Sequence, residues 1–485
     1  MYLGIDIGTS AVKAVIVSPN GLVASEARMP LDVSRPNALW SEQDPADWWE
    51  ATNQAVNRLD PALRRQVRAI GIAGQMHGAV LLDRNGLPLR PAILWNDGRS
   101  FAQCAELERS EPALREISGN IAMPGFTAPK LLWVRENEPD IFDRTAHVLL
   151  PKDYVRLRMT GEFATDLSDA SGTLWLDVAA RAWSDRLLTA TGLDRTAMPN
   201  VFEGPAATGI LRAELAEAWN MSRVPVAAGA GDNAAGAIGV GVTAPGDALL
   251  SLGTSGVVFA VTDRFRPNAE GAVHAFCHCL PGVWHQMSVM LSAAACLEWA
   301  RAFTRFGTVS EMLADLEAAE QPPVDEIFLP YLSGERTPHN NPDALAVFFG
   351  LGPDTDPRRM AMAVLEGVAM GLADGVAALA AAGTRLDRIN VVGGGARSPL
   401  WGRILASAIG IPLVYREGGE VGPSFGAAKL AQICVGDGDI DSVCTAPPVR
   451  SVIEPDKRLS EHFQRQQERF RSLYRTVKGQ FGRIH

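Results

Sequence analysis

One short pattern occurs twice in the chain and limits the folds that the sequence can adopt. The stretches GIDIGTSAVKAVIV at 4–17 and LLSLGTSGVVFAV at 249–261 each contain an apolar run, Gly-Thr-Ser and a second apolar run. Two such runs around a glycine turn are typical of a β-hairpin. The copies are separated by about half of the 485 residues. Similarity at that distance indicates a duplicated domain, because solenoid repeats are only about 20–50 residues long.

Further strand and helix signals follow the first hairpin. An Asn-Gly pair at 20–21 favours the tight turn that matches strand twist, so we expect a third strand after it. Asp44 followed by Pro45 is a typical helix start. A buried strand, a glycine-containing break and another strand are indicated at 67–83. Mixed strands and helices of this kind indicate an α/β protein.

The second half of the chain repeats this order. Strand, glycine turn and helix are indicated at 224–242 and again at 388–398, and the last 30 residues have the spacing of a terminal helix. We therefore predict two α/β domains of similar build, at 1–245 and 246–485, with a cleft between them where ligands bind.

Composition excludes several kinds of partner. The net charge of −10 argues against nucleic acid or an anionic membrane surface. The chain starts with a strand rather than a basic and apolar leader, and no run of about 18 uncharged apolar residues occurs. The six cysteines form no disulfide framework. We expect a cytoplasmic protein that binds neither nucleic acid nor membrane.

The stretch HAFCHC at 274–279 could be taken for a metal site. On a strand, His274 and His278 would face one side while Cys277 and Cys279 face the other, so four ligands do not easily converge. We expect ordinary strand residues there, with zinc as the alternative.

Glycine turns at strand ends offer sites for phosphate. A strand that ends in Gly-Thr-Ser exposes backbone N–H groups and two hydroxyls, which can hold phosphate oxygens. One copy alone is more simply a hairpin turn, but two copies facing each other across a cleft favour phosphate. The turn at 393–395 is a third, where missing side chains let a ligand approach the backbone. The P-loop pattern G-x-x-x-x-G-K-[ST] does not occur at these turns.

A dinucleotide fingerprint also has to be considered. The stretch GAGDNA at 229–234 fits G-x-G-x-x-G/A after a strand. However, the acid inside that turn would repel pyrophosphate, and the following strand ends without an acid to hold a ribose. A dehydrogenase is therefore not expected.

Two aspartates are candidates for chemistry at the cleft. Asp6 ends the first strand, where it could hold Mg²⁺ directly or through water; alternatively it bonds its own turn. The second copy has Ser251 at the matching position, so we expect only one lobe to carry metal. Asp232 stands between a strand and a helix and faces the same cleft; alternatively it is only a helix N-cap.

Six blocks carry a resemblance to a known family. GIDIGTS, PGFTAPKLLWV, GAGDNAAGA, ALLSLGTSG, LPYLSGERTP and VVGGGARS resemble the FGGY family of carbohydrate kinases, and the similarity extends from residue 1 to about 435. The resemblance implies two duplicated actin- and hexokinase-like (ribonuclease H-like) domains that close over a sugar and ATP. It also implies ATP-dependent phosphorylation of D-xylulose to D-xylulose 5-phosphate in xylose catabolism, with Mg²⁺. A homodimer is implied only by the resemblance.

The resemblance also implies roles for individual residues. Asp232 would be the general base, while Met76, His77 and Asn233 would bind the ketose. The phosphate, magnesium and adenosine regions would use Asp6, Thr9, Thr254, Gly394, Gly395 and Ser398.

Residue chemistry independently offers further sugar contacts. A sugar site needs hydrogen-bonding groups and flat apolar surface. The candidates of these types are His77, Trp95, Asp97, Arg99 and Arg336. Trp95 could equally be a core residue, and His77 could instead end a strand. A related kinase for ribulose, gluconate or glycerol, or an actin-like ATPase that is no kinase, remains an alternative.

Overall fold

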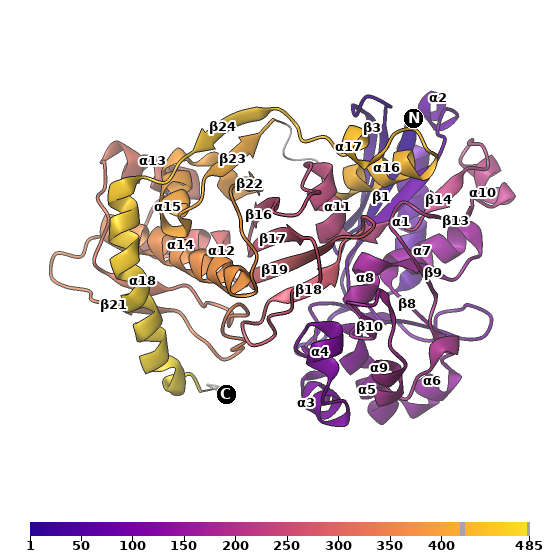
Figure 1. The fold of residues 1–485 in the computed structure, drawn as a ribbon, viewed down its shortest axis with the longest axis horizontal. Coiled ribbons are helices and arrows are strands. Elements are labelled where there is room, and N and C mark those ends of the chain that lie inside the picture. Colours follow the sequence, from indigo (N-terminus) through magenta and orange to yellow (C-terminus); the bar gives the residue numbers. More distant parts are fainter. Residues whose placement is uncertain (418–421, 483–485) are drawn as a thin grey trace.

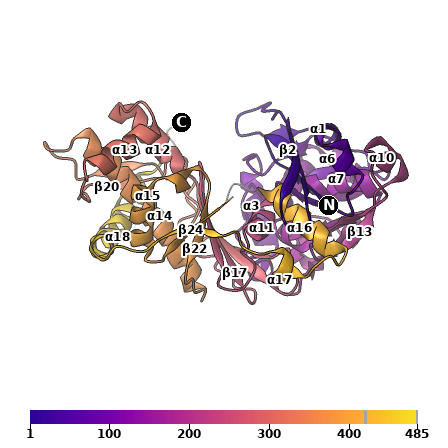
Figure 2. The same ribbon diagram turned by 90° about the horizontal axis from the view of Figure 1, so that it is seen from above.

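Both predicted hairpins are present, and each lies inside a seven-stranded sheet. The computed structural model describes residues 1–417 and 422–482, except the side chains of residues 396 and 397. In the first lobe, β1 (Tyr2–Ile7) pairs antiparallel with β2 (Ala11–Val17). In the second lobe, β16 (Ala248–Leu252) pairs in the same way with β17 (Gly256–Thr262). Figures 1 and 2 show the two lobes side by side, with the first in indigo to magenta.

The two sheets follow the same plan. In the first, β3 (Val23–Pro30) continues the antiparallel side, while β5 (Ile70–Gly74) lies parallel to β1 on the other. In the second, β19 (Trp284–Met290) continues the antiparallel side, while β22 (Ile389–Val392) lies parallel to β16. This shared order confirms the two-domain α/β fold that the repeated hairpin predicted.

Local signals also predicted helix α1 (Pro45–Arg58) correctly. The Asp44 side chain caps it by accepting a hydrogen bond from the Ala46 N–H at 2.9 Å, and Pro45 occupies its first turn. Trp48 is completely buried on its inner face. A cap, a proline at the start and one apolar face are sufficient to define such a helix.

The chain returns to the first lobe near its end. Helix α16 (Pro423–Cys434) packs on β1 and β5, and Figures 1 and 2 both show this orange helix beside the indigo strands. A Cβ at Gly4 would lie 1.9 Å from the Ser424 carbonyl oxygen, and one at Gly71 would lie 1.8 Å from that of Ala427. Only glycine allows this approach. The boundary at 245/246 therefore stays a prediction, while α16 belongs in space to the first lobe.

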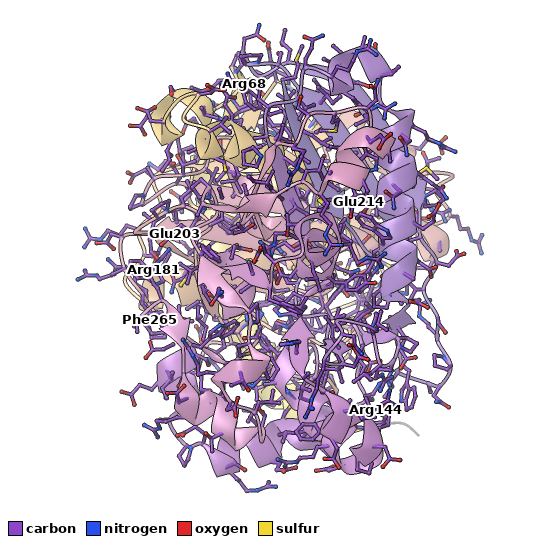
Figure 3. All side chains as sticks on the ribbon, turned by 90° about the vertical axis from the view of Figure 1, so that its right-hand side faces the viewer. Arg68, Arg144, Arg181, Glu203, Glu214 and Phe265 are labelled. Atoms are coloured by element: carbon purple, nitrogen blue, oxygen red, sulfur yellow. The ribbon has the colours of Figure 1, made fainter. Side chains whose placement is uncertain are left out.

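An ion pair secures the returning segment. Asp437, just after α16, lies 2.5 Å from Arg68 of the first lobe. Figure 3 labels Arg68 beside the yellow return segment.

Helix α14 (Pro357–Ala381) forms the centre of the second lobe. By length and composition alone it could cross a membrane, but 89% of its most apolar stretch is buried inside the protein, as in a core helix. The predicted terminal helix is α18 (Lys457–Val477), which buries Phe463 and Phe470. Arg471 on α18 bonds Asp374 on α14 at 2.6 Å. Residues 483–485 of the predicted terminal segment lie outside the described residues.

The lobes are joined along β19 and its neighbour β18 (His274–Cys277). Arg181 of the first lobe bonds Glu203 at 2.8 Å and also donates to the Val283 carbonyl of the second lobe at 2.8 Å. Its guanidinium lies 4.9 Å from the Trp284 ring centre. Figure 3 labels Arg181 and Glu203 together at one edge of the molecule.

Candidate active site

The second Gly-Thr-Ser turn forms part of the wall of two cavities. Gly253 and Thr254 line the larger, of about 600 Å³. Ser255 of the turn lines the smaller, of about 270 Å³, together with Ser251 of β16. A group bound in one cavity would therefore lie next to a group bound in the other.

The larger cavity belongs to the second lobe. The structure brings Thr254, Gly394, Gly395 and Ser398 together in its wall, as the predicted nucleotide site requires. A Cβ at Gly395 would lie 2.6 Å from the Trp401 ring, so the turn can pass only without a side chain there. Ser398 caps the next helix, α15 (Pro399–Ile409), by accepting a hydrogen bond from the Trp401 N–H at 3.2 Å.

The smaller cavity lies between the lobes. Both lobes supply polar groups to it, and the rings of Phe126 and Phe276 add apolar surface. The polar and sulfur-containing side chains of interest are Met76, His77, Asp232, Asn233, His274 and Arg336. All the residues predicted to bind sugar from the family resemblance are therefore in one place.

Asp232 is the first residue of helix α11 (Asp232–Gly239), and Gly231 is the N-cap. The N-cap interpretation of Asp232 is therefore wrong. Its Oδ1 accepts hydrogen bonds from the backbone N–H and side-chain amide of Asn233, at 2.7 and 2.9 Å. Burial raises the pKa of Asp232 to about 6, although the bonds from Asn233 oppose this shift. The carboxylate can therefore accept a proton near neutral pH.

Asp6 lies close enough to Asp232 for the two charges to interact. Burial, followed by the charge of Asp232, raises the pKa of Asp6 to about 7, against a smaller opposing effect of Lys13. Its buried Oδ1 has no hydrogen-bond partner among the described residues. An unpartnered carboxylate oxygen beside a second carboxylate fits a hard cation such as Mg²⁺, which needs only one or two protein carboxylates.

Thr9 lines neither cavity within the described residues. Its hydroxyl donates to the Gln75 side-chain oxygen at 2.9 Å and accepts from the Trp95 indole N–H at 2.9 Å. Trp95 lines the smaller cavity and is 46% exposed. Thr9 thus orients Trp95, and Trp95 is a cleft residue rather than a core residue.

His77 has a defined protonation state. Its Nδ1 lies 2.6 Å from the Gly172 carbonyl oxygen, and since a carbonyl can only accept, Nδ1 carries the hydrogen. Burial lowers the pKa of His77 to about 3, against the bond to Gly172. The neutral ring therefore keeps Nε2 as an acceptor. The backbone has φ of 68°, a left-handed conformation that is uncommon outside glycine and concentrates at functional sites.

His274 and Arg336 form a pair on the opposite lobe. An Arg336 Nη donates to His274 Nε2 at 3.2 Å, and His274 Nδ1 lies 3.1 Å from the Asn120 side-chain oxygen. Burial, together with the charge of Arg336, holds the pKa of His274 well below its usual value. Sequence reasoning missed His274 as a site residue. The available signal was that His274 and Phe276 share one strand face.

The stretch around His274 holds no group of three or more metal-ligating side chains, as far as the described residues go. His274–Cys277 form strand β18, as expected, while the absence of zinc stays a prediction. The prediction that Asp97 and Arg99 contact the sugar is wrong, because neither residue lines the smaller cavity. Asp97 accepts hydrogen bonds from the Arg99 guanidinium at 2.7 and 2.9 Å and from the Ser41 N–H at 2.6 Å. The carboxylate of Asp97 and the guanidinium of Arg99 therefore neutralise each other outside the cavity.

Comparison with known proteins agrees with this arrangement. Residues 1–239 match the N-terminal domain, and residues 248–434 the C-terminal domain, of the FGGY family of carbohydrate kinases. The chain is 53% identical over 479 residues to a xylulose kinase of Escherichia coli (strain K12), covering 98% of this chain and 99% of the relative. It is 52% identical over 480 residues to one of Klebsiella pneumoniae, covering 99% of each.

Solved structures show the same similarity. A crystal structure described as a xyloylose kinase from Brucella ovis superposes with a TM-score of 0.94 at 47% identity, covering 99% of each chain. Two family models thus match most of the chain, and full-length relatives match it closely. The chain belongs to the FGGY family of carbohydrate kinases.

Proposed function

We propose that the chain transfers the terminal phosphoryl group of ATP to a hydroxyl of D-xylulose, giving D-xylulose 5-phosphate and ADP in the breakdown of xylose. One observation carries this proposal: the turn at 253–255 forms a wall of both cavities, and Asp232 lines the smaller. The full-length similarity to xylulose kinases supports the choice of sugar.

In this proposal the sugar occupies the smaller cavity. His77 Nε2 accepts a hydrogen bond from one hydroxyl, and Arg336 can donate to oxygen atoms from the other lobe. Asn233 adds an amide, while Met76 and Trp95 supply apolar surface. A site built from paired donors and acceptors rejects molecules that leave these groups unpaired, which is how it would distinguish sugars.

Asp232 acts as the general base in the transfer step. It accepts the proton of the attacking hydroxyl, and its raised pKa suits this task. Phosphoryl transfer otherwise depends on positioning and on neutralising charge. The second Gly-Thr-Ser turn, with Thr254, brings hydroxyls and backbone groups to the phosphates, while Gly394, Gly395 and Ser398 border the nucleoside end.

Asp6 would hold Mg²⁺, directly or through water, and the ion when bound would neutralise charge on the phosphate oxygens. The hydroxyl of Thr9 is bonded to Gln75 and Trp95, so any contribution of Thr9 to phosphate binding would come from the backbone N–H groups of its Gly-Thr-Ser turn. The proposal includes a cytoplasmic location, no nucleic-acid or membrane partner, and a homodimer. The net charge of −10 supports the exclusion of nucleic acid.

The test is ADP release with D-xylulose, D-ribulose, gluconate and glycerol as acceptors, and without any acceptor. We expect the highest kcat/KM with D-xylulose. A higher value with another acceptor would identify a related sugar kinase instead. Release of ADP that no acceptor increases would indicate an actin-like ATPase.

The rate should depend on pH through the two aspartates. Because the base must be unprotonated, kcat/KM for D-xylulose should fall as the pH drops through about 6, the value to which burial raises the pKa of Asp232. Since Asp6 interacts with Asp232, the apparent midpoint belongs to the pair. The measurement is initial rate at saturating ATP between pH 4.5 and 8.5, with a melting curve at each pH. A rate that stays constant down to pH 5 would exclude Asp232 as the titrating base.

A further inference from the structure

A short buried helix, α8 (Leu167–Ser171), contacts the segment that carries Asp232. The Ser168 Oγ accepts a hydrogen bond from the N–H of Gly231 at 3.1 Å. Gly231 is the residue immediately before Asp232. We propose that Ser168 is a positioning residue for the carboxylate of Asp232; this inference rests on the proposed function.

The bond from Gly231 has a fixed direction. The Ser168 hydroxyl donates its hydrogen to Asp166 Oδ2 at 2.5 Å. With its hydrogen committed to a carboxylate, the hydroxyl presents a lone pair to the Gly231 N–H. A hydroxyl that donates to a charged acceptor is also a better acceptor itself. Ser168 therefore holds the Gly231 peptide in one orientation.

Gly231 also packs closely against Met76. A Cβ there would lie 2.9 Å from the Met76 sulfur, so the backbone packs directly against a cavity residue. Gly231 thus contacts both Met76 and Ser168. A shift of this peptide moves the first residue of α11, which is Asp232.

The segment leading to Gly231 has a second support. Arg156, on helix α7 (Pro151–Thr160), donates to the Ala228 carbonyl at 2.9 Å. The same guanidinium bonds Asp153 and the Ala164 carbonyl. Both ends of the short segment 228–231 are therefore attached to side chains of other elements.

A buried ion cluster anchors α8 itself. The Lys152 ammonium lies 2.6 Å from Asp153, 2.8 Å from Asp166 and 3.2 Å from Asp169, and all four side chains are fully buried. Asp166 is the N-cap of α8 and Asp169 lies within it. Breaking a buried ion pair is strongly unfavourable, so the cluster keeps α8 in place.

The other end of α8 reaches the sugar side of the cavity. Its C-cap residue, Gly172, is the residue whose carbonyl accepts from His77 Nδ1 at 2.6 Å. A Cβ at Gly172 would lie 2.6 Å from the His77 ring. The helix α8 and its C-cap thus contact both the segment of the base and the predicted sugar histidine.

The chain offers a matched control for Ser168. Ser171 is also on α8 and fully buried, and its Oγ likewise accepts from a backbone N–H, that of Cys277 at 3.0 Å, while donating to the Leu167 carbonyl. Among the described residues, the Ser171 hydroxyl makes no hydrogen bond to the segment 228–233. Ser171→Ala therefore removes the same kind of bond from the same helix without affecting the base segment.

Ser168→Ala should lower kcat with D-xylulose by about 10- to 100-fold, because a small misplacement of a reacting group has a large effect on rate. The KM for ATP should stay within about threefold of wild type, and Ser171→Ala should keep kcat within about threefold. Ser168→Cys, which keeps a weak donor and acceptor, should lose less than Ser168→Ala. Equal loss of kcat in both alanine variants, or kcat of Ser168→Ala within threefold of wild type, would overturn the proposal.

Hydrogen exchange of the full-length protein without substrate gives an independent readout. Amide exchange in the peptide covering 228–233 should become faster in Ser168→Ala and stay unchanged in Ser171→Ala. Unchanged exchange in Ser168→Ala would contradict the positioning of this segment. If the wild-type chain fails to phosphorylate D-xylulose, the proposed function is wrong, while the exchange comparison still decides whether Ser168 holds the segment.

Discussion

Replacing Asp232 by asparagine should lower kcat by roughly 10²–10⁴-fold, because an amide cannot take the proton of the attacking hydroxyl. The amide keeps the size of the side chain and an oxygen that can still accept from Asn233, so we expect the melting temperature to change little. Affinity for D-xylulose should also survive, since the amide can still hydrogen-bond the sugar. Steady-state kinetics, calorimetric sugar binding and a melting curve on one preparation measure all three.

Asp247→Asn is the matched control. The Asp247 carboxylate accepts hydrogen bonds from the backbone N–H groups of Thr243 and Ala244, at 3.1 and 2.9 Å, in a turn outside both cavity linings. The Asp247→Asn variant should keep kcat within about threefold of wild type. A folded Asp232→Asn variant with turnover as high as this control would remove Asp232 from the mechanism.

Replacing Lys152 by methionine should lower the free energy of unfolding by about 3–5 kcal/mol, since removing one partner leaves buried charges uncompensated. Burial disfavours the charged ammonium, but the three neighbouring aspartates raise the pKa of Lys152 above its usual range, so it is charged in the folded protein. Burial also raises the pKa of Asp169 well above its ordinary value. Thermal and urea unfolding followed by two probes would measure the loss in a two-lobe protein.

Two further variants make this result specific. Lys13→Met makes the same change at a surface pair, where Lys13 lies 3.3 Å from the exposed Glu26, and should cost less than about 1 kcal/mol. Asp169→Asn added to Lys152→Met should restore part of the stability, because it removes one of the carboxylates left without a cation. A Lys152→Met variant as stable as Lys13→Met would show that the cluster contributes little.

Features determined by neighbouring residues were predictable from the sequence. The hairpins follow from apolar runs around Gly-Thr-Ser, and α1 follows from Asp44 and Pro45. Asp232 and His77 each stand just after a strand, where polar side chains meet at the edge of an α/β sheet, and the structure places both in one cavity.

Features that depend on distant residues were not predictable in this way. The return of α16 to the first sheet depends on Gly4 and Gly71, which lie more than 350 residues earlier in the sequence. Asp97 has the chemistry of a sugar ligand, but its carboxylate pairs with the Arg99 guanidinium at 2.7 Å. Only the structure shows this ion pair. The residues of the Lys152 cluster come from two helices and a strand, and no short pattern marks them as partners.

The position of α16 has a consequence for how the chain is made. During synthesis the strands of the first sheet leave the ribosome early, but the helix that covers β1 and β5 is about 350 residues behind them. At a synthesis rate of about 5–20 residues per second, the growing first lobe keeps one sheet face uncovered for tens of seconds. Such long-range contacts slow folding and expose apolar surface to aggregation. The first lobe to be synthesised is therefore completed only when nearly nine-tenths of the chain has been translated.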